Sequence, residues 1–284
     1  MNIVKFHGGL GNQLFQYGLY RKLEIIGKKV KADVSWYNGN KAESDRDFGL
    51  AEFGIGLNKC NKFEVGLRDN IVVRLLKKYF NFSTFLFQEE TSGKFVPEVF
   101  KVKNKLLEGY WQSEEYFKDI RSVLLKELVF PQTVTCKEER ILERVRKTES
   151  VSVHIRRGDY LNHQDKYGNV CTEGYYIKAI QYMKTKISNP VFFVFSDDMA
   201  WSREFLKGYS NVEFVELGES VKSIHDMKLM AACKYNIIAN SSFSWWASWL
   251  NQNPDKIVIA PDRWRNDCIS EDIMCENWIK MLPE

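Results

Sequence analysis

Short apolar runs alternate with helical stretches throughout the second half of this chain, and this alternation constrains the fold more than any other feature. The apolar runs are rich in β-branched and aromatic residues, which is typical of buried strands. The stretches between them have the spacing of helices. The expected strands are residues 151–155, 191–195, 212–217, 235–239 and 256–260. Such alternation predicts an α/β fold, in which helices cover both faces of a parallel sheet.

The first half of the chain begins with the same pattern and then loses it. Residues 3–6 and 30–34 are expected strands on either side of a helix at 12–26, whereas residues 37–96 show no clear period. A strand at 105–110, a long helix at 113–128 and a charged helix at 137–147 are expected to follow. We place the boundary between two Rossmann-like lobes after the last of these, which gives domains 1–148 and 149–284.

Charge and composition exclude several classes of protein. The 284 residues include 41 basic and 37 acidic side chains, which is too balanced for a general nucleic-acid binder. The N-terminus lacks the pattern of a secretory signal, and no apolar run is long enough to span a bilayer. We therefore expect a cytoplasmic protein; peripheral association with the inner face of the membrane stays open. The six cysteines form no Cys-x-x-Cys pair, so we expect no structural zinc.

The segment His154-Ile155-Arg156-Arg157-Gly158-Asp159-Tyr160 ends the first strand of the second half. Alternation along a strand sends Arg156 and His154 to one side and Arg157 to the other, so the two arginines are expected to differ in role. A guanidinium group can hold phosphate oxygens with two parallel hydrogen bonds. The alternative is that an arginine pairs with an aspartate and ties the loop to the sheet, as Arg157 could do with an acid such as Asp159.

The segment Asn240-Ser241-Ser242-Phe243-Ser244 follows the expected strand at 235–239 and opens a helix. Free backbone N–H groups at a helix N-terminus bind phosphate, and serine hydroxyls add to them. Helix capping by one serine is the simpler explanation. Capping does not comfortably explain three serines with an asparagine, so we predict a phosphate site here.

Two further segments follow expected strands. Gly8-Gly9-Leu10-Gly11-Asn12-Gln13 approximates a dinucleotide-binding loop with Asp33 downstream, but Leu14 stands where the third glycine belongs. Ser196-Asp197-Asp198 offers carboxylates that could bind a metal, a guanine base or a sugar; alternatively, Ser196 or Asp197 could cap the next helix. Both segments would lie at the carboxyl edge of a sheet, where α/β proteins bind ligands.

Together these segments resemble glycosyltransferase family 11, specifically its bacterial α-1,2-fucosyltransferases. The resemblance covers nearly the whole chain and rests on residues 8–13, 154–160, 195–198 and 240–246. The arginine segment is also similar to that of α-1,6- and protein O-fucosyltransferases, so by itself it indicates GDP-fucose rather than a linkage. The glycine–asparagine loop and the serine–tryptophan segment make the α-1,2 family the best match.

The resemblance implies a GT-B architecture with a cleft between the lobes, an inverting mechanism and no essential metal or cofactor. It implies transfer of L-fucose from GDP-β-L-fucose to a hydroxyl of a galactose-containing glycan, as in bacterial polysaccharide biosynthesis. The expected catalytic residues are Arg156, Asp159 and Asn12, with Asp159 as the candidate base. The expected donor-binding residues are His154, Arg156, Arg157, Ser196, Asp197, Asp198, Asn240, Ser241, Ser242 and Phe243.

Several alternatives stay open at this point. The chain could catalyse another fucosyl linkage, or it could be a metal-dependent sugar-nucleotide transferase that uses Asp197 and Asp198. It could be an NAD-linked enzyme that uses the glycine loop and Asp33. A sugar-binding protein without catalysis is the weakest alternative, because it leaves the arginines without a purpose.

Overall fold

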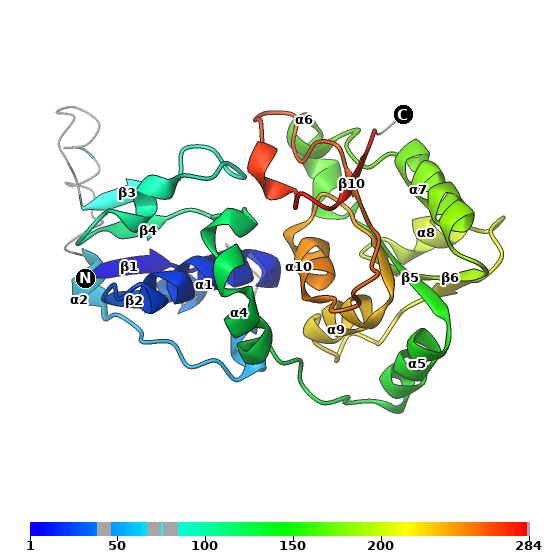
Figure 1. The fold of residues 1–284 in the computed structure, drawn as a ribbon, viewed down its shortest axis with the longest axis horizontal. Helices are drawn as coiled ribbons and strands as arrows, with labels where there is room; N and C mark the ends of the chain where they lie inside the picture. The colour runs from blue at the N-terminus through cyan, green and yellow to red at the C-terminus, as the bar shows by residue number, and fades with distance from the viewer. Residues whose placement is uncertain (39–46, 67–74, 76–84, 283–284) are drawn as a thin grey trace. The chain divides into compact units, whose positions relative to one another are not determined.

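The chain divides into two compact units, Met1–Val129 and Phe130–Glu284. The computed structural model describes residues 1–38, 47–66, 75 and 85–282, as Figure 1 shows. The division falls earlier than the expected boundary at 148/149, because helix α5 (Cys136–Lys147) packs against the second unit. The carboxylate of Glu138 on α5 is fully buried there and lies 3.0 Å from both His225 Nδ1 and Lys228 Nζ.

The described part of the N-terminal unit contains a four-stranded parallel sheet in the order β2-β1-β4-β3. Helix α1 (Leu10–Ile25) connects β1 to β2, as the glycine loop and the following pattern predict. The strands are β1 (Asn2–Lys5), β2 (Val30–Asp33), β3 (Leu86–Gln88) and β4 (Leu106–Glu108). The other elements are α2 (Lys62–Gly66) and the 3-10 helices Ser35–Asn38, Gly49–Phe53 and Pro97–Phe100. Much of the stretch 37–96 lies outside the described residues.

The prediction of one long helix at 113–128 is wrong. The chain instead forms two 3-10 turns, Glu114–Tyr116 and Lys118–Ile120, before helix α4 (Arg121–Glu127). Phe117 interrupts the helix with an extended φ of −149° and is completely buried. Its ring lies against Gly18 of α1, where an added Cβ would come within 2.4 Å of the ring. Packing against α1 therefore overrides the local helical preference.

The C-terminal unit contains a parallel sheet that, within residues 130–282, has six strands in the order β10-β9-β8-β5-β6-β7. The central strand β5 (Glu149–Ile155) pairs with β6 (Pro190–Ser196) on one side and with β8 (Tyr235–Ile237) on the other. The remaining strands are β7 (Val212–Phe214), β9 (Val258–Pro261) and β10 (Ile279–Met281). The sequence did not predict β10, which is short and half-buried.

Helices lie on both faces of this sheet (Figure 1). They are α6 (Gln164–Tyr167), α7 (Glu173–Lys186), α8 (Met199–Phe205), α9 (Ile224–Ala232) and α10 (Ser242–Leu250). Trp245 and Trp249 share a face of α10 and are almost fully buried, so they belong to the core. The α/β class predicted from the sequence is thus confirmed, with a parallel sheet in each unit. Among the described residues, no helix is both long and apolar enough to cross a membrane.

Candidate active site

The register of two central strands brings the arginine and aspartate segments together. Ile155 of β5 pairs with Ser196 of β6, so the residues that follow leave the sheet side by side. Arg156 Nη1 then lies 2.9 Å from Asp197 Oδ2, and both side chains are only partly exposed. The pairing alternative raised from the sequence is therefore confirmed for Arg156, and any ligand-binding role must coexist with it.

Arg157 takes different partners from Arg156, as strand alternation predicts. Its Nε lies 3.1 Å from Asp198 Oδ2, and its guanidinium lies 4.0 Å from the ring centroid of Trp201. Cation–π contact of this kind fixes an arginine in place. The sequence suggested an acid such as Asp159 as the partner of Arg157. The structure shows Asp198 in contact with Arg157, because β5 and β6 continue in register beyond their ends, whereas the side chain of Asp159 lies outside the described residues.

Asp197 and Asp198 contact the two arginines and also accept hydrogen bonds from backbone N–H groups. Asp198 is the N-cap of α8, and its Oδ1 accepts a hydrogen bond from the backbone N–H of Trp201 at 3.1 Å. The sequence had assigned this capping role to Ser196 or Asp197. Asp197 Oδ1 instead accepts from the backbone N–H of Arg157 at 2.8 Å. Across the described residues, no group of three or more His, Cys, Asp and Glu side chains is arranged to hold a metal ion.

Gly158 is required by the contact between Arg156 and Asp197. A Cβ added at Gly158 would lie 2.6 Å from Asp197 Oδ2, the oxygen that Arg156 contacts. Any larger residue would therefore displace this carboxylate. Asp159 follows as the first residue of a 3-10 helix that extends to Asn162, and its side chain lies outside the described residues.

His154 links the end of β5 to the start of α10. Its Nδ1 lies 2.9 Å from Ser244 Oγ, and the side chain is buried. Burial, with a further contribution from the charge of Arg156, lowers the pKa of His154 to about 3. The imidazole is therefore neutral near pH 7, which suits a positioning role and not proton transfer.

The serine segment caps helix α10 and still leaves groups that could bind a phosphate. Ser241 is the N-cap of α10, although its bond to the N–H of Phe243 is long at 3.4 Å. Ser244 is buried and contacts His154. Ser242 and Phe243 begin the helix and are partly exposed. Two of the three serines are thus used by the fold, and the N-terminal turn of α10 keeps an accessible side.

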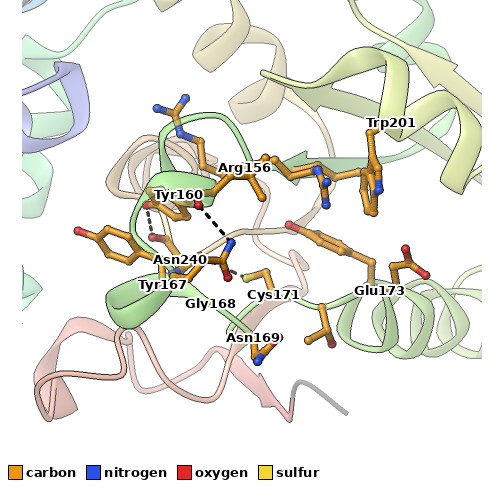
Figure 2. Close-up of a pocket in the computed structure, with 15 residues that line it drawn as sticks. Arg156, Tyr160, Tyr167, Gly168, Asn169, Cys171, Glu173, Trp201 and Asn240 are labelled. Carbon is orange, nitrogen blue, oxygen red and sulfur yellow. Dashed lines mark hydrogen bonds between the residues drawn. The ribbon is translucent and has the colours of Figure 1, made fainter.

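Asn240 is held by protein groups on both atoms of its side-chain amide. Its Nδ2 donates to the carbonyl of Trp264 at 3.0 Å, and its Oδ1 lies 3.5 Å from Cys171 Sγ. The hydroxyl of Tyr160 donates to the backbone carbonyl of Asn240 at 2.8 Å (Figure 2). Asn240 is almost fully buried, so its contacts fix the loop that carries the serines.

A cavity of about 270 Å³ adjoins the arginines at the carboxyl end of β5. Trp201 and Glu173 line it on the side shown at the right of Figure 2. The Arg156 guanidinium points away from Glu173 and Asn169 in that view. The cavity is also lined by Tyr160, Leu161, Gln164, Tyr167, Cys171, Thr172 and Tyr176.

In the N-terminal unit, hydrogen bonds to the backbone of Gly8 hold the glycine loop in place. Gly8 has a φ of +81°, and its carbonyl accepts from Gln13 Nε2 at 3.0 Å and from the Tyr37 hydroxyl at 2.9 Å. Asn12 lies in the first turn of α1, and its Oδ1 accepts from Gln112 Nε2 at 2.8 Å. Asp33 is buried and accepts from the N–H of Ser35 at 2.9 Å. Asp33 therefore closes a local turn.

Sequence reasoning missed two residues at these sheet edges. Trp201, beside Arg157, was assigned only to a helix, and Gln112 was not singled out. The sequence offered no distinctive signal for Trp201, because its place beside Arg157 depends on the register of β5 and β6 and on the Asp198 cap. It also offered none for Gln112, which follows a strand in a stretch without a motif.

Parallel sheets with arginines, carboxylates and a helix N-terminus at one carboxyl edge are typical of α/β enzymes that bind phosphorylated small molecules. The family model described as glycosyl transferase family 11 matches residues 67–281. The chain belongs to this family and is therefore a glycosyltransferase, not the NAD-linked enzyme or the sugar-binding protein considered above.

Two bacterial relatives are similar over nearly their whole length. An α-1,2-colitosyltransferase of Escherichia coli is 34% identical, with 98% of each chain covered. The O-antigen biosynthesis glycosyltransferase WbnK of Escherichia coli is 30% identical, covering 96% of this chain and 98% of WbnK.

More distant matches include a mammalian enzyme and a solved structure. The galactoside 2-α-L-fucosyltransferase Sec1 of Mus musculus is 32% identical over 54% of this chain and 43% of its own length. The crystal structure of the α-1,6-fucosyltransferase NodZ soaked with GDP-fucose matches at 13% identity, with a TM-score of 0.46, over 88% of this chain and 92% of that one.

Proposed function

We propose that this protein is an inverting α-1,2-fucosyltransferase that moves L-fucose from GDP-β-L-fucose to a galactoside hydroxyl of a glycan. The observation that carries the proposal is the edge of the C-terminal sheet, where Arg156 and Arg157 are each braced by an aspartate. The His154–Ser244 contact joins this edge to the N-terminus of α10. These groups suit a diphosphate.

The chemistry follows from how charge moves during a single displacement. The acceptor oxygen attacks C1 of fucose while the bond from C1 to the phosphate oxygen breaks, and GDP leaves. Negative charge grows on the diphosphate, where fixed donors stabilise it without reorganisation. The four formal charges of the two arginines and two aspartates cancel, so binding depends on donors that face the ligand. Arg156 and the first turn of α10 are the donors we assign to that role.

Proton removal from the acceptor needs a base, and we propose Asp159 for it. Asp159 comes two residues after Arg157 and begins a 3-10 helix at the same sheet edge. Replacement by asparagine should lower turnover by roughly a hundredfold, within the usual range for general bases. The acid limb of the pH–rate profile should disappear in the same variant.

Two sugars are candidates for the group that is transferred, L-fucose and colitose. Colitose is L-fucose without its 3-hydroxyl group, and a colitosyltransferase is 34% identical to this chain. GDP-colitose is therefore the second candidate donor. A site that binds the 3-hydroxyl would leave its own polar groups unpaired with colitose and reject it strongly.

A donor screen tests both candidates. Purified protein is given GDP-fucose, GDP-colitose, GDP-mannose or a UDP-sugar with a β-galactoside acceptor, and the product linkage is determined by NMR. We expect an α-1,2 linkage and a higher kcat/KM with GDP-fucose than with GDP-colitose. A preference for GDP-colitose would exchange the two candidates, and transfer only from a UDP-sugar would overturn the proposal.

We also propose that transfer requires no metal. Asp197 and Asp198 contact arginines, and the arginines with the α10 N-terminus supply positive charge to the diphosphate. GDP affinity and transfer rate should be unchanged in EDTA. Loss of both in EDTA, with recovery on adding Mn²⁺, would establish the metal-dependent alternative.

A further inference from the structure

The side-chain amide of Asn12 is held in one orientation by Gln112. Gln112 is buried, its Nε2 donates to Asn12 Oδ1 at 2.8 Å, and its Oε1 accepts from Ser92 Oγ at 2.9 Å. Both polar atoms of the Gln112 amide are therefore paired, with Gln112 donating to Asn12 and accepting from Ser92. The Oδ1 of Asn12 is therefore occupied, and the donor atom Nδ2 is left to face a ligand.

Gly8 keeps the Nδ2 atom of Asn12 accessible. A Cβ added at Gly8 would come within 2.8 Å of Nδ2, so any other residue would cover the amide nitrogen. The left-handed φ of +81° at Gly8 favours glycine for a second, independent reason. The loop thus combines a fixed donor with an open approach to it.

The turn that carries Gln112 is unusual and is held by a carboxylate. Trp111 has a φ of +57°, which is rare for a bulky residue. Glu89 Oε2 accepts from the backbone N–H of Tyr110 at 2.6 Å and of Trp111 at 3.2 Å. A Cβ at Gly109 would lie 2.8 Å from the same oxygen, so the turn is shaped around Glu89.

We propose that Gln112 and Glu89 are positioning residues that present Asn12 Nδ2 as a hydrogen-bond donor to an oxygen of the sugar substrates. Gln112 sets the direction of the amide, and Glu89 fixes the strained turn that places Gln112. A donor without charge suits a hydroxyl oxygen of a glycan. The identity of the sugars rests on the proposed function, whereas the orientation of Asn12 does not.

The decisive substitution is Gln112→Glu, which replaces the amide donor with a carboxylate oxygen and adds a negative charge. A glutamate keeps the size of Gln112 and its bond to Ser92 Oγ, but it cannot donate to Asn12. The Asn12 amide must then rotate to donate to the new carboxylate, which turns Oδ1 toward the ligand. We expect kcat/KM for the acceptor to fall roughly ten- to hundredfold, the range for one misdirected hydrogen bond, while GDP affinity stays within about twofold.

Gln88→Glu is the matched control, because Gln88 ends β3 at the same sheet edge and is exposed. It adds the same charge without touching Asn12 and should leave kcat/KM unchanged. Glu89→Ala should show the loss seen with Gln112→Glu, and Glu89→Gln should restore activity because its amide oxygen still accepts both N–H groups. Equal losses in Gln88→Glu and Gln112→Glu would overturn the proposal, as would an unaffected Gln112→Glu.

NMR of protein labelled with ¹⁵N-asparagine separates this proposal from the proposed function. The Asn12 side-chain signals are assigned as those missing from the Asn12→Asp variant. They should shift in Gln112→Glu and stay in place in Gln88→Glu, whichever sugar nucleotide the protein uses. An unshifted Asn12 signal in Gln112→Glu would show that Gln112 does not orient the amide, even if fucose transfer is established.

Discussion

The carboxyl edges of the two sheets differ in kind. The edge of the C-terminal sheet is charged, with Arg156 and Arg157 each paired with an aspartate. The edge of the N-terminal sheet has one ion pair, between Lys5 and Glu108, but its glycine loop lies beside neutral amides, of which Asn12 and Gln112 contact each other. Charged donors stabilise a transition state in which negative charge accumulates. Neutral amides suit the recognition of sugar hydroxyl groups. Because of this difference we assign charge stabilisation to the C-terminal sheet and sugar recognition to the N-terminal sheet.

The largest expected effect lies on the charged edge, at Arg156. Arg156→Lys keeps the charge but loses the fork of donors that can contact Asp197 and a phosphate together. Turnover should fall roughly a hundred- to a thousandfold, or about 3–4 kcal/mol, which is the range for one charge-stabilising donor. Steady-state kinetics on protein of matched thermal stability would measure this loss.

Arg157→Lys is the control for that prediction. It should lose the contact with Trp201 and about 1 kcal/mol of stability, while keeping turnover within about tenfold of the parent. If Arg157→Lys is inactive and Arg156→Lys is active, the roles of the two arginines are exchanged.

A smaller effect is expected from Gly158→Ala, which tests whether the aspartate brace matters. The new methyl group would lie 2.6 Å from Asp197 Oδ2 and push that carboxylate from Arg156. Turnover should fall roughly tenfold to a hundredfold, as expected when a catalytic group is displaced by about an ångström. Transfer assays with a thermal unfolding control would check it. Full activity would mean that Arg156 acts without help from Asp197.

At the edge of the N-terminal sheet, the substitution Asn12→Ala is expected to have a smaller effect on transfer. Removing one neutral hydrogen bond costs about 1 kcal/mol, so kcat/KM for transfer should fall roughly fivefold. GDP affinity, measured by calorimetry, should stay nearly unchanged because we assign the diphosphate to the charged edge. A large loss of GDP binding in this variant would place the nucleotide at the glycine loop and break the comparison.

At the edge of the N-terminal sheet, the effect expected from Glu89→Gln is on stability and leaves activity unchanged, because the amide oxygen still accepts the Tyr110 and Trp111 N–H groups. Burial raises the pKa of Glu89 to about 7, against the lowering effect of the Trp111 and Tyr110 N–H groups. The folded state therefore binds a proton that the unfolded state has released, so stability falls as pH rises from about 4.5 through about 7.

Glu89→Gln removes this dependence. Its unfolding free energy relative to the parent should improve between pH 4.5 and pH 8 by about 2–3 kcal/mol, from the size of the shift. Urea unfolding at the two pH values measures the difference. Parallel pH dependence in the two proteins would show that Glu89 titrates normally.

The sequence predicted most elements of the C-terminal unit because their patterns are strong. Strands such as β5 and β6 are buried on both faces and are flanked by capping residues, of which Thr172 caps α7 as expected. The long helix at 113–128 failed because the decisive contact, between Phe117 and Gly18, joins residues far apart in the chain. The short strand β10 and the Asp198 cap lacked a distinctive local signal.

The chemistry of the candidate site was determined by the sequence, and its geometry was decided by the tertiary structure. Residue types at strand ends already indicated phosphate chemistry, because donors and helix N-termini act through local groups. The partners of those residues depend on strand register and on contacts across the sheet. Arg157 therefore pairs with Asp198, which lies on the neighbouring strand's segment. Gln112 reaches Asn12 only because β1 and β4 are neighbours in the sheet, a proximity that no local pattern encodes.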